Sequence, residues 1–268
     1  MKKIALLLSG LPRMWQPSLQ TQLDMLQEHD VDVFFHFWDT IDQPEKDALL
    51  ALLKPKACMF DPPRDFSEMD RRADIKHDKI NVPSRITSQF YSWSRVAQLF
   101  APYVKDYDFA LRSRSDLQFV YSIAHAFNEL KPNDLVVSWA LHERLVSDIF
   151  AFGGAEAIHF YLTLYDQLEE YIRTCDYNPE ALLTHHLGRR TDIHIYTEDF
   201  KFFFIRRPHM TDYTIEQCLA EDYGANKWLN PEVVENHRQF FGAVHGEDGI
   251  AHVEAFRAKQ IARIKRSS

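Results

Sequence analysis

Short apolar runs alternate with helix-like segments over the first sixty residues, and this alternation constrains the fold most. Residues 3–9, 31–38 and 56–60 are apolar runs of strand length, and the segments between them, 17–29 and 44–54, have apolar residues at helical spacing. A β-α-β-α-β order favours a largely parallel sheet, because consecutive parallel strands need a crossover between them. We therefore expect an α/β protein whose ligand sits at the carboxyl ends of the strands.

Length and composition indicate a globular protein without a broad nucleic-acid surface. The chain has 268 residues, 46% of them hydrophobic and 13% aromatic, which is enough for a sizeable core. We expect one main domain, residues 1–209, and a small helical C-terminal appendage, residues 210–268, where the pattern becomes irregular. A net charge of -8 argues against nucleic acid as a partner, because phosphate binding needs a basic face.

The termini and cysteines indicate a cytoplasmic protein. The N-terminal lysines and apolar run lack a small-residue cleavage pattern, so we expect a first strand there and no signal peptide. No segment approaches the roughly 20 apolar residues that span a bilayer. Cys58, Cys175 and Cys218 are widely spaced and form no CxxC pair, which fits a reducing compartment.

Loop composition excludes two common nucleotide-binding classes. The first loop, "SGLPR", has neither GxGxxG nor GxxxxGK[ST], and the whole chain has only eight glycines. A dinucleotide-binding fold or a P-loop enzyme is therefore not expected. Residues 61–78 are charged and weakly periodic, which predicts either a solvated loop or a lid over the edge of the active site.

A concentration of charge follows the apolar run in "YDFALRSRSDLQF". Arg112, Arg114 and Asp116 occupy alternate positions there, so they would project from one face of a strand unless the backbone bends. Two guanidinium groups beside a carboxylate can bind phosphates while the carboxylate holds a metal, or they can form a structural ion pair. Both interpretations stay open at this point.

Five segments in order carry a resemblance to a known group of enzymes: "LLLSGLPRMW", "SQFYSWSRV", "YDFALRSRSDLQF", "SDIFAFGGAEAI" and "NPEALLTHHL". Over roughly residues 3 to 205 the chain resembles bacterial and viral glycosyltransferases of the GT-A type that act on surface polysaccharides. The resemblance implies a Rossmann-like GT-A fold with a mainly parallel mixed sheet flanked by helices. It also implies a nucleotide-sugar donor bound near the first strand and a DxD-like acidic motif after a central strand.

The acidic motif departs from the pattern of that group. It would read Arg114-Ser115-Asp116, so only Asp116 matches the position that helps to bind Mn²⁺ or Mg²⁺ at the donor diphosphate. Arg112 or Arg114 could carry part of the diphosphate charge instead. His186 could supply a further metal ligand, whereas His185 and His186 together could not, because helix neighbours point about 100° apart.

Further donor-binding residues are expected in the first loop and the central helix. Ser9, Gly10 and Arg13 resemble a donor-binding loop, although a plain turn would explain the same residues. Ser88, Gln89 and Tyr91 could contact the nucleotide or could lie on the helix surface.

Three carboxylates are candidates for the base that deprotonates an acceptor hydroxyl. Asp148 is the leading candidate, and Glu156 and Glu180 are alternatives. The sequence predicts a helix at residues 178–188, with Asn178, Pro179 and Glu180 in its first turn and Gly188 at its end. A first-turn glutamate such as Glu180 also stabilises a helix dipole without any catalytic role.

The last helix, from residue 252 onward, has Val253, Phe256, Ile261 and Ile264 on one side and basic residues around it. It could rest at the inner face of an anionic membrane, where lipid-linked acceptors reside, or dock on the core. The sequence thus predicts a glycosyltransferase that moves a sugar from a nucleotide-diphosphate donor to a glycan or lipid-linked glycan acceptor. The alternative is a non-catalytic nucleotide- or glycan-binding protein on the same fold.

Overall fold

The chain divides into two compact units, Met1–Phe204 and Ile205–Ser268. The computed structural model describes residues 1–13, 15–72, 83–119, 123–138, 145–198 and 202–204, and beyond these only single positions and short stretches between 235 and 262. The described positions of the second unit are helical, and Val253 is buried there. Phe256 and Ile264, named above as part of an apolar side, lie outside the described residues.

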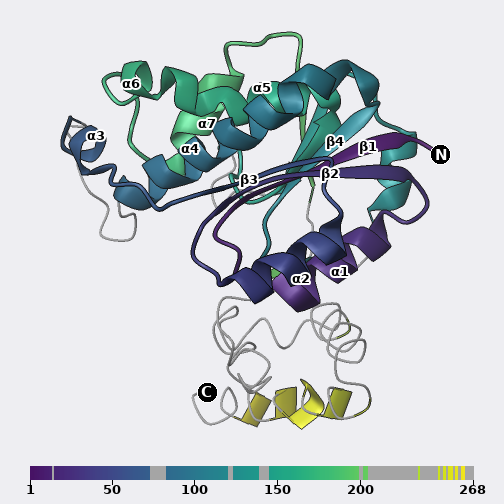
Figure 1. Ribbon diagram of the computed structural model, residues 1–268. Helices are drawn as coiled ribbons and strands as arrows, with labels where there is room; N and C mark the ends of the chain where they lie inside the picture. Colours follow the sequence, from purple (N-terminus) through teal and green to yellow (C-terminus); the bar gives the residue numbers. More distant parts are fainter. Residues whose placement is uncertain are drawn as a thin grey trace. The chain divides into compact units, whose positions relative to one another are not determined.

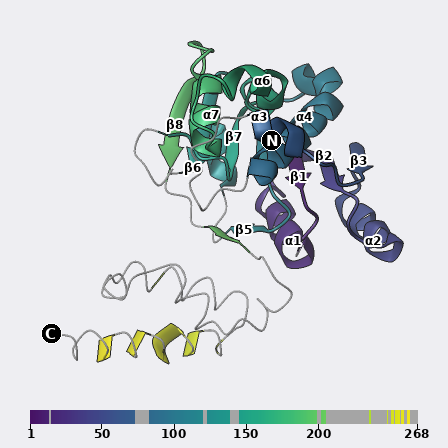
Figure 2. The same ribbon diagram turned by 90° about the vertical axis from the view of Figure 1, so that its left-hand side faces the viewer.

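A seven-stranded sheet forms the centre of the first unit, in the order β3-β2-β1-β4-β7-β6-β8. Figure 2 shows β8 and β3 at its opposite edges. Neighbouring strands are parallel except β7, which is antiparallel to β4 and to β6. The strands are β1 (Lys3–Gly10), β2 (Asp30–Trp38), β3 (Ala57–Asp61), β4 (Phe109–Ser113), β6 (Asp134–Ser138), β7 (Ala151–Gly154) and β8 (His194–Glu198).

A second, two-stranded sheet joins β5 (Leu117–Phe119) to β9 (Phe202–Phe204) in antiparallel register. The predicted fold class, a mainly parallel mixed sheet flanked by helices, is confirmed. The arrangement is consistent with the Rossmann-like GT-A fold expected from the resemblance.

The central strands are buried on both faces, which explains why their sequences are almost continuously apolar. In β1, Ala5 and Leu7 point into one hydrophobic core, while Leu6 and Leu8 point into the other. Each is fully buried. Such a strand can be stable only between two layers of helices.

The helices supply those two layers (Figure 1). On one face lie α1 (Trp15–Met25) and α2 (Gln43–Leu53), and on the other lie α4 (Pro83–Phe100), α5 (Ala155–Leu162) and α7 (Pro179–Leu187). The predicted helix at residues 178–188 is confirmed, because the Asn178 side chain caps its first turn and Gly188 ends it. Among the described residues, none of the helices has the length and apolar character needed to cross a membrane.

The charged segment after β3 contains a short helix, α3 (Ser67–Arg72). Asp61 itself is the last residue of β3 and Phe66 is buried, so the first part of this segment packs on the unit. Positions 73–82 of the predicted lid lie outside the described residues.

Candidate functional site

The strand order reverses between β1 and β4. From β1 the chain moves outward to β2 and β3, then returns through α4 to place β4 on the other side of β1. Ligands of open α/β sheets bind outside the carboxyl ends of the strands at such a reversal. Leu8 is in register with Ser113, so the loops that follow β1 and β4 begin side by side.

β1 ends on a glycine in a conformation that other residues avoid. Gly10 has φ of +113°, and a Cβ built on it would meet no atom within 4 Å. Glycine is therefore required here by backbone conformation and not by lack of space. Beside it, the Ser9 and Ser113 hydroxyls are buried and have no hydrogen-bond partner in the described structure. Buried orphan hydroxyls at a strand end are typical of a site that takes water or a ligand.

Ser115 joins the two loops. Its hydroxyl lies 2.7 Å from the Leu11 carbonyl oxygen and 3.2 Å from the Arg13 carbonyl oxygen, so it donates its one proton to the backbone of the first loop. From α1, the buried Gln22 amide donates to the carbonyl oxygens of Arg114 and Leu117 at 2.9 and 2.6 Å. The two loops at the reversal point are thus held as one unit.

Arg114 and Asp116 form a bidentate ion pair within the second loop. The guanidinium Nε and Nη2 donate to the two carboxylate oxygens at 2.7 and 2.9 Å, and the Asp116 side chain is only 3% exposed. Burial alone would lower the pKa of Arg114, but the hydrogen bonds and charge of Asp116 outweigh it and raise that pKa. Arg114 therefore stays charged in one fixed orientation.

The same Arg-x-Asp pairing occurs elsewhere in the unit. Arg190 donates to both oxygens of Asp192 at 2.6 Å, and there the side chains are 37% and 50% exposed. A bidentate pair across one residue is therefore a local turn feature that does not by itself mark a site. What distinguishes Arg114 and Asp116 is their burial and the attachment to the first loop.

Arg112 does not share a face with Arg114 and Asp116, because the backbone turns after Ser113. Its side chain is buried in the core, with the guanidinium 4.3 Å from the Trp93 ring centroid and Nη1 donating to the Asp148 and Ile149 carbonyl oxygens. Burial lowers the pKa of Arg112 to about 10. Arg112 thus lies beneath the site and binds backbone carbonyl groups there. The expectation that Arg112, Arg114 and Asp116 project together from one face was wrong.

Asp148 lies at the same edge of the sheet as the charged loop. Because β7 is antiparallel to β4, its first residue, Ala151, pairs with Arg112, and the segment before it reaches the carboxyl end of β4. The Gln89 amide donates to Asp148 Oδ2 at 2.6 Å, and the side chain is half-buried. Asp148 also contributes to raising the pKa of Arg114, so the two charges are close enough to interact.

Other predicted residues lie apart from these contacts. Ser88 is half-buried on α4. Glu156 is exposed in the first turn of α5, where it lines a different cavity with His159 and Lys105. Glu180 is half-buried in the first turn of α7 beside the capping Asn178, as the dipole explanation predicts.

The structure does not support His186 as a metal ligand. Its Nε2 donates to the Phe160 carbonyl oxygen at 2.8 Å, and its Nδ1 accepts from the Tyr171 hydroxyl at 3.0 Å, so both ring nitrogens are occupied. Burial lowers its pKa to about 4, which keeps the ring neutral. Across the part of the chain that the structure describes, no three His, Cys, Asp or Glu side chains are grouped to hold a metal ion.

Comparison with known proteins gives distant structural likenesses only. No protein-family model and no curated protein matches the sequence. A crystal structure assigned as a nucleotide-diphospho-sugar transferase from Desulfovibrio desulfuricans G20 aligns with 74% of this chain and 80% of its own, at 15% identity and a TM-score of 0.40. The glycosyltransferase GlyE of Streptococcus pneumoniae TIGR4 aligns with 88% of this chain at 13% identity and a TM-score of 0.42, and the match spans 51% of its length. Similarity this low says nothing about individual side chains, so the function proposed below rests on the contacts of this chain.

Two structural residues of the site had no readable signal in the sequence. Ser115 and Gln22 act through contacts more than 90 positions away along the chain. Gln22 belongs to no motif, and Ser115 is the unspecified middle position of the DxD-like motif. Asp61 did offer a signal, since it is an acidic residue that directly follows a strand run. Its contacts with His36 and Arg95 form a second polar cluster at the same edge of the sheet.

Proposed function

We propose that the protein is a glycosyltransferase that moves a sugar from a nucleotide-diphosphate-sugar donor to a hydroxyl of a glycan acceptor. The observation that carries the proposal is the Ser115 link between the loops after β1 and β4. It joins the loop after β1 to the loop that carries the half-buried, fixed Arg114 guanidinium, at the point where an α/β sheet binds its ligand. The ordered sequence segments that resemble GT-A transferases support the same assignment.

In this proposal Arg114 faces the donor diphosphate. A guanidinium suits phosphate oxygens because it is planar and permanently charged, and Asp116 fixes its orientation before the donor arrives. Preorganised charge of this kind stabilises the negative charge that develops on a leaving group. We propose that Arg13, which is exposed on the first loop, contacts the same diphosphate.

Asp148 is the proposed base. Its Oδ2 accepts from Gln89, whereas its Oδ1 takes no hydrogen bond from the described residues. The acceptor hydroxyl gives its proton to Asp148, and its oxygen bonds to the anomeric carbon. The bond from that carbon to the diphosphate oxygen breaks, and the nucleoside diphosphate leaves. Arg112 acts only through the backbone, because it holds the Asp148 and Ile149 carbonyl groups from below.

A divalent cation takes no step in this proposal. The resemblance implies Mn²⁺ or Mg²⁺ at Asp116, but both oxygens of that carboxylate already accept from Arg114 and the side chain is almost fully buried. As arranged, the donor set does not fit a metal, because the Asp116 charge is already paired with Arg114 and burial leaves its oxygens little access for a cation. Arg114 carries the charge that a cation would otherwise supply.

The same ion pair is also compatible with the alternative, a non-catalytic nucleotide- or glycan-binding protein, because it occupies the carboxylate at which the resemblance implies a metal. Turnover separates the two. The full chain is incubated with UDP-, GDP- and dTDP-linked hexoses, and release of nucleoside diphosphate is followed with and without Mn²⁺. We expect release from at least one donor, a fall of about 10²-fold in Arg114→Gln, and no change in the matched Arg190→Gln variant. A donor that stabilises the fold without being turned over supports the alternative.

A further inference from the structure

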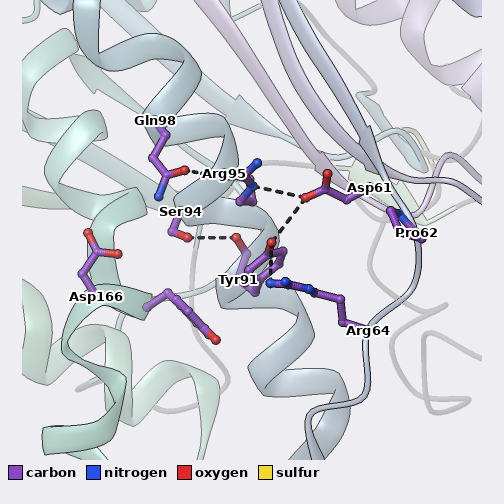
Figure 3. Close-up of a pocket in the computed structure, with 9 residues that line it drawn as sticks. Asp61, Pro62, Arg64, Tyr91, Ser94, Arg95, Gln98 and Asp166 are labelled. Carbon is purple, nitrogen blue, oxygen red and sulfur yellow. Dashed lines mark hydrogen bonds and ion pairs between the residues drawn. The ribbon is translucent and has the colours of Figure 1, made fainter.

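A second polar cavity lies beside the edge strand β3, over the middle of α4 (Figure 3). Its volume is about 470 Å³, within the roughly 300–1,000 Å³ of small-ligand sites. The segment after β3 forms one wall, and the 3-10 helix η3 (Thr163–Gln167) forms the opposite wall. Of the residues that the sequence suggested for the donor, only Tyr91 lines it.

Asp61 and Arg95 line the floor of the cavity and bind each other. Asp61 Oδ2 accepts from Arg95 Nε at 3.2 Å, and buried His36 lies 3.3 Å away without hydrogen-bond geometry. The remaining Arg95 nitrogens donate to Gln98 Oε1 at 2.5 Å and to the Met59 sulfur at 2.7 Å. The Arg95 charge is therefore neutralised within the protein, and its side chain acts as a rigid surface.

Two other charges face the cavity from opposite walls. Arg64 donates to the Tyr91 hydroxyl at 2.8 Å, its guanidinium lies 4.9 Å from that ring, and no carboxylate among the described residues pairs with it. Asp166 lies on the other side of the α4 side chains (Figure 3). Its carboxylate forms no hydrogen bond or ion pair with the described residues. Burial raises the pKa of Asp166, with His159 acting the other way. The cavity thus offers one cation with spare donors and one carboxylate with spare acceptors.

Aromatic rings complete the lining. Tyr91 and Tyr165 meet edge to face at 5.3 Å, and Tyr91 is stacked on Trp38 at 5.5 Å. Tyr91 also donates to Asp61 at 3.3 Å. These contacts fix the ring before any ligand binds, so the aromatic surface costs little ordering entropy on binding.

We infer that this cavity is a saccharide-binding site for a neutral, hydroxyl-rich sugar unit. Hydroxyl groups both donate and accept, so they can satisfy Arg64 and Asp166 at once. Tyr91 is buried, stacked on Trp38 and overlain by Arg64, so the aromatic ring left for the apolar face of a sugar is the half-buried Tyr165. A phosphate would gain Arg64 but would be repelled by Asp166, while Asp61 and Arg95 neutralise each other. The lining has two arginines and two aspartates, so it carries no net charge for an anion to neutralise.

The place of the cavity adds a role that rests on the proposed function. β3 lies two strands from β1, which is on the order of 10 Å along the same edge of the sheet. A saccharide held there would be the far part of an acceptor chain whose end reaches the donor site. Binding itself can be tested without any turnover.

The test is a titration of the full chain with neutral hexasaccharides of glucose, galactose and mannose, each followed by NMR. Inorganic phosphate and UMP serve as anionic probes. Arg64→Met and Asp166→Asn each remove one proposed contact from an exposed position, while Arg173→Met and Asp106→Asn are matched exposed changes outside the cavity. We expect at least one hexasaccharide to bind, with affinity about tenfold or more weaker in the first two variants and unchanged in the controls.

Three results would overturn the inference. No hexasaccharide binds, or the affinity of the bound hexasaccharide is the same in Arg64→Met and Asp166→Asn as in the parent, or phosphate and UMP bind in the cavity and the hexasaccharides do not. The Arg114→Gln variant separates this inference from the proposed function. Saccharide binding should survive that substitution while turnover is lost. Turnover without saccharide binding would overturn the inference and leave the transferase proposal standing, and binding without turnover would do the reverse.

Discussion

Replacing Ser115 by alanine removes the link between the two loops and little else. The hydroxyl has one proton, shared between the Leu11 and Arg13 carbonyl oxygens at 2.7 and 3.2 Å, so the variant loses about one net hydrogen bond. The Leu11 carbonyl oxygen still accepts from the Arg13 backbone N–H at 2.8 Å, and Arg13 is exposed, so that water can solvate its carbonyl group. We therefore expect a loss of about 1 kcal/mol in the free energy of unfolding, or about 2–4 °C in Tm.

Donor affinity should fall more than stability does. In the variant the first loop must be ordered when the ligand binds, and fixing even one or two residues costs about 1–2 kcal/mol each. The Kd for the best-binding nucleoside diphosphate, measured calorimetrically, should rise at least about tenfold. Ser94→Ala is the control, because that buried hydroxyl also donates to a carbonyl oxygen, at 3.0 Å from Tyr91 O, but on α4. Equal affinities in both variants and the parent would refute the reasoning.

Three further predictions follow from individual contacts. Asp116→Asn should lower turnover by about 10²-fold while the protein still folds, whereas Asp192→Asn, in the exposed counterpart, should leave kcat unchanged. Arg112→Met should cost about 2 kcal/mol or more in urea unfolding, because two buried carbonyl groups lose their donor. Burial lowers the pKa of His36 and of His186 to about 4, below the ordinary 6.5, so stability should fall as pH drops from 6.5 to 4. The slope is at most about 1.4 kcal/mol per pH unit for each histidine, and His186→Gln should reduce it.

Local pattern was sufficient to predict the strands and one helix in detail. The apolar runs at 3–9, 31–38 and 56–60 correspond to β1, β2 and β3. β1 and the second half of β2 are apolar because both of their faces are buried, whereas β3 is an edge strand that is only partly buried. The helix after Asn178 was readable from its cap, its proline and its terminal Gly188. The direction of β7 was not predictable, since it depends on pairing with β4 about forty residues earlier.

The site was predictable in position but not in its contacts. Parallel strands place the loops after β1 and β4 together, so Gly10 and Asp116 could be assigned to one edge. The turn after Ser113 could not be predicted. Because of it, Arg112 lies in the core while Arg114 and Asp116 pair with each other in the following loop. His186 suggested a metal ligand by residue type alone, and its two hydrogen bonds appear only when α5, α6 (Leu168–Tyr171) and α7 have packed.

The most direct test of the central claim is a crystal structure of the full chain with the nucleoside diphosphate that binds best. The account predicts that the diphosphate lies against the Arg114 guanidinium and the backbone of Leu11 to Arg13, with the Arg114–Asp116 pair and the Ser115 link intact. A nucleotide bound away from the carboxyl ends of β1 and β4, with these contacts untouched, would contradict it.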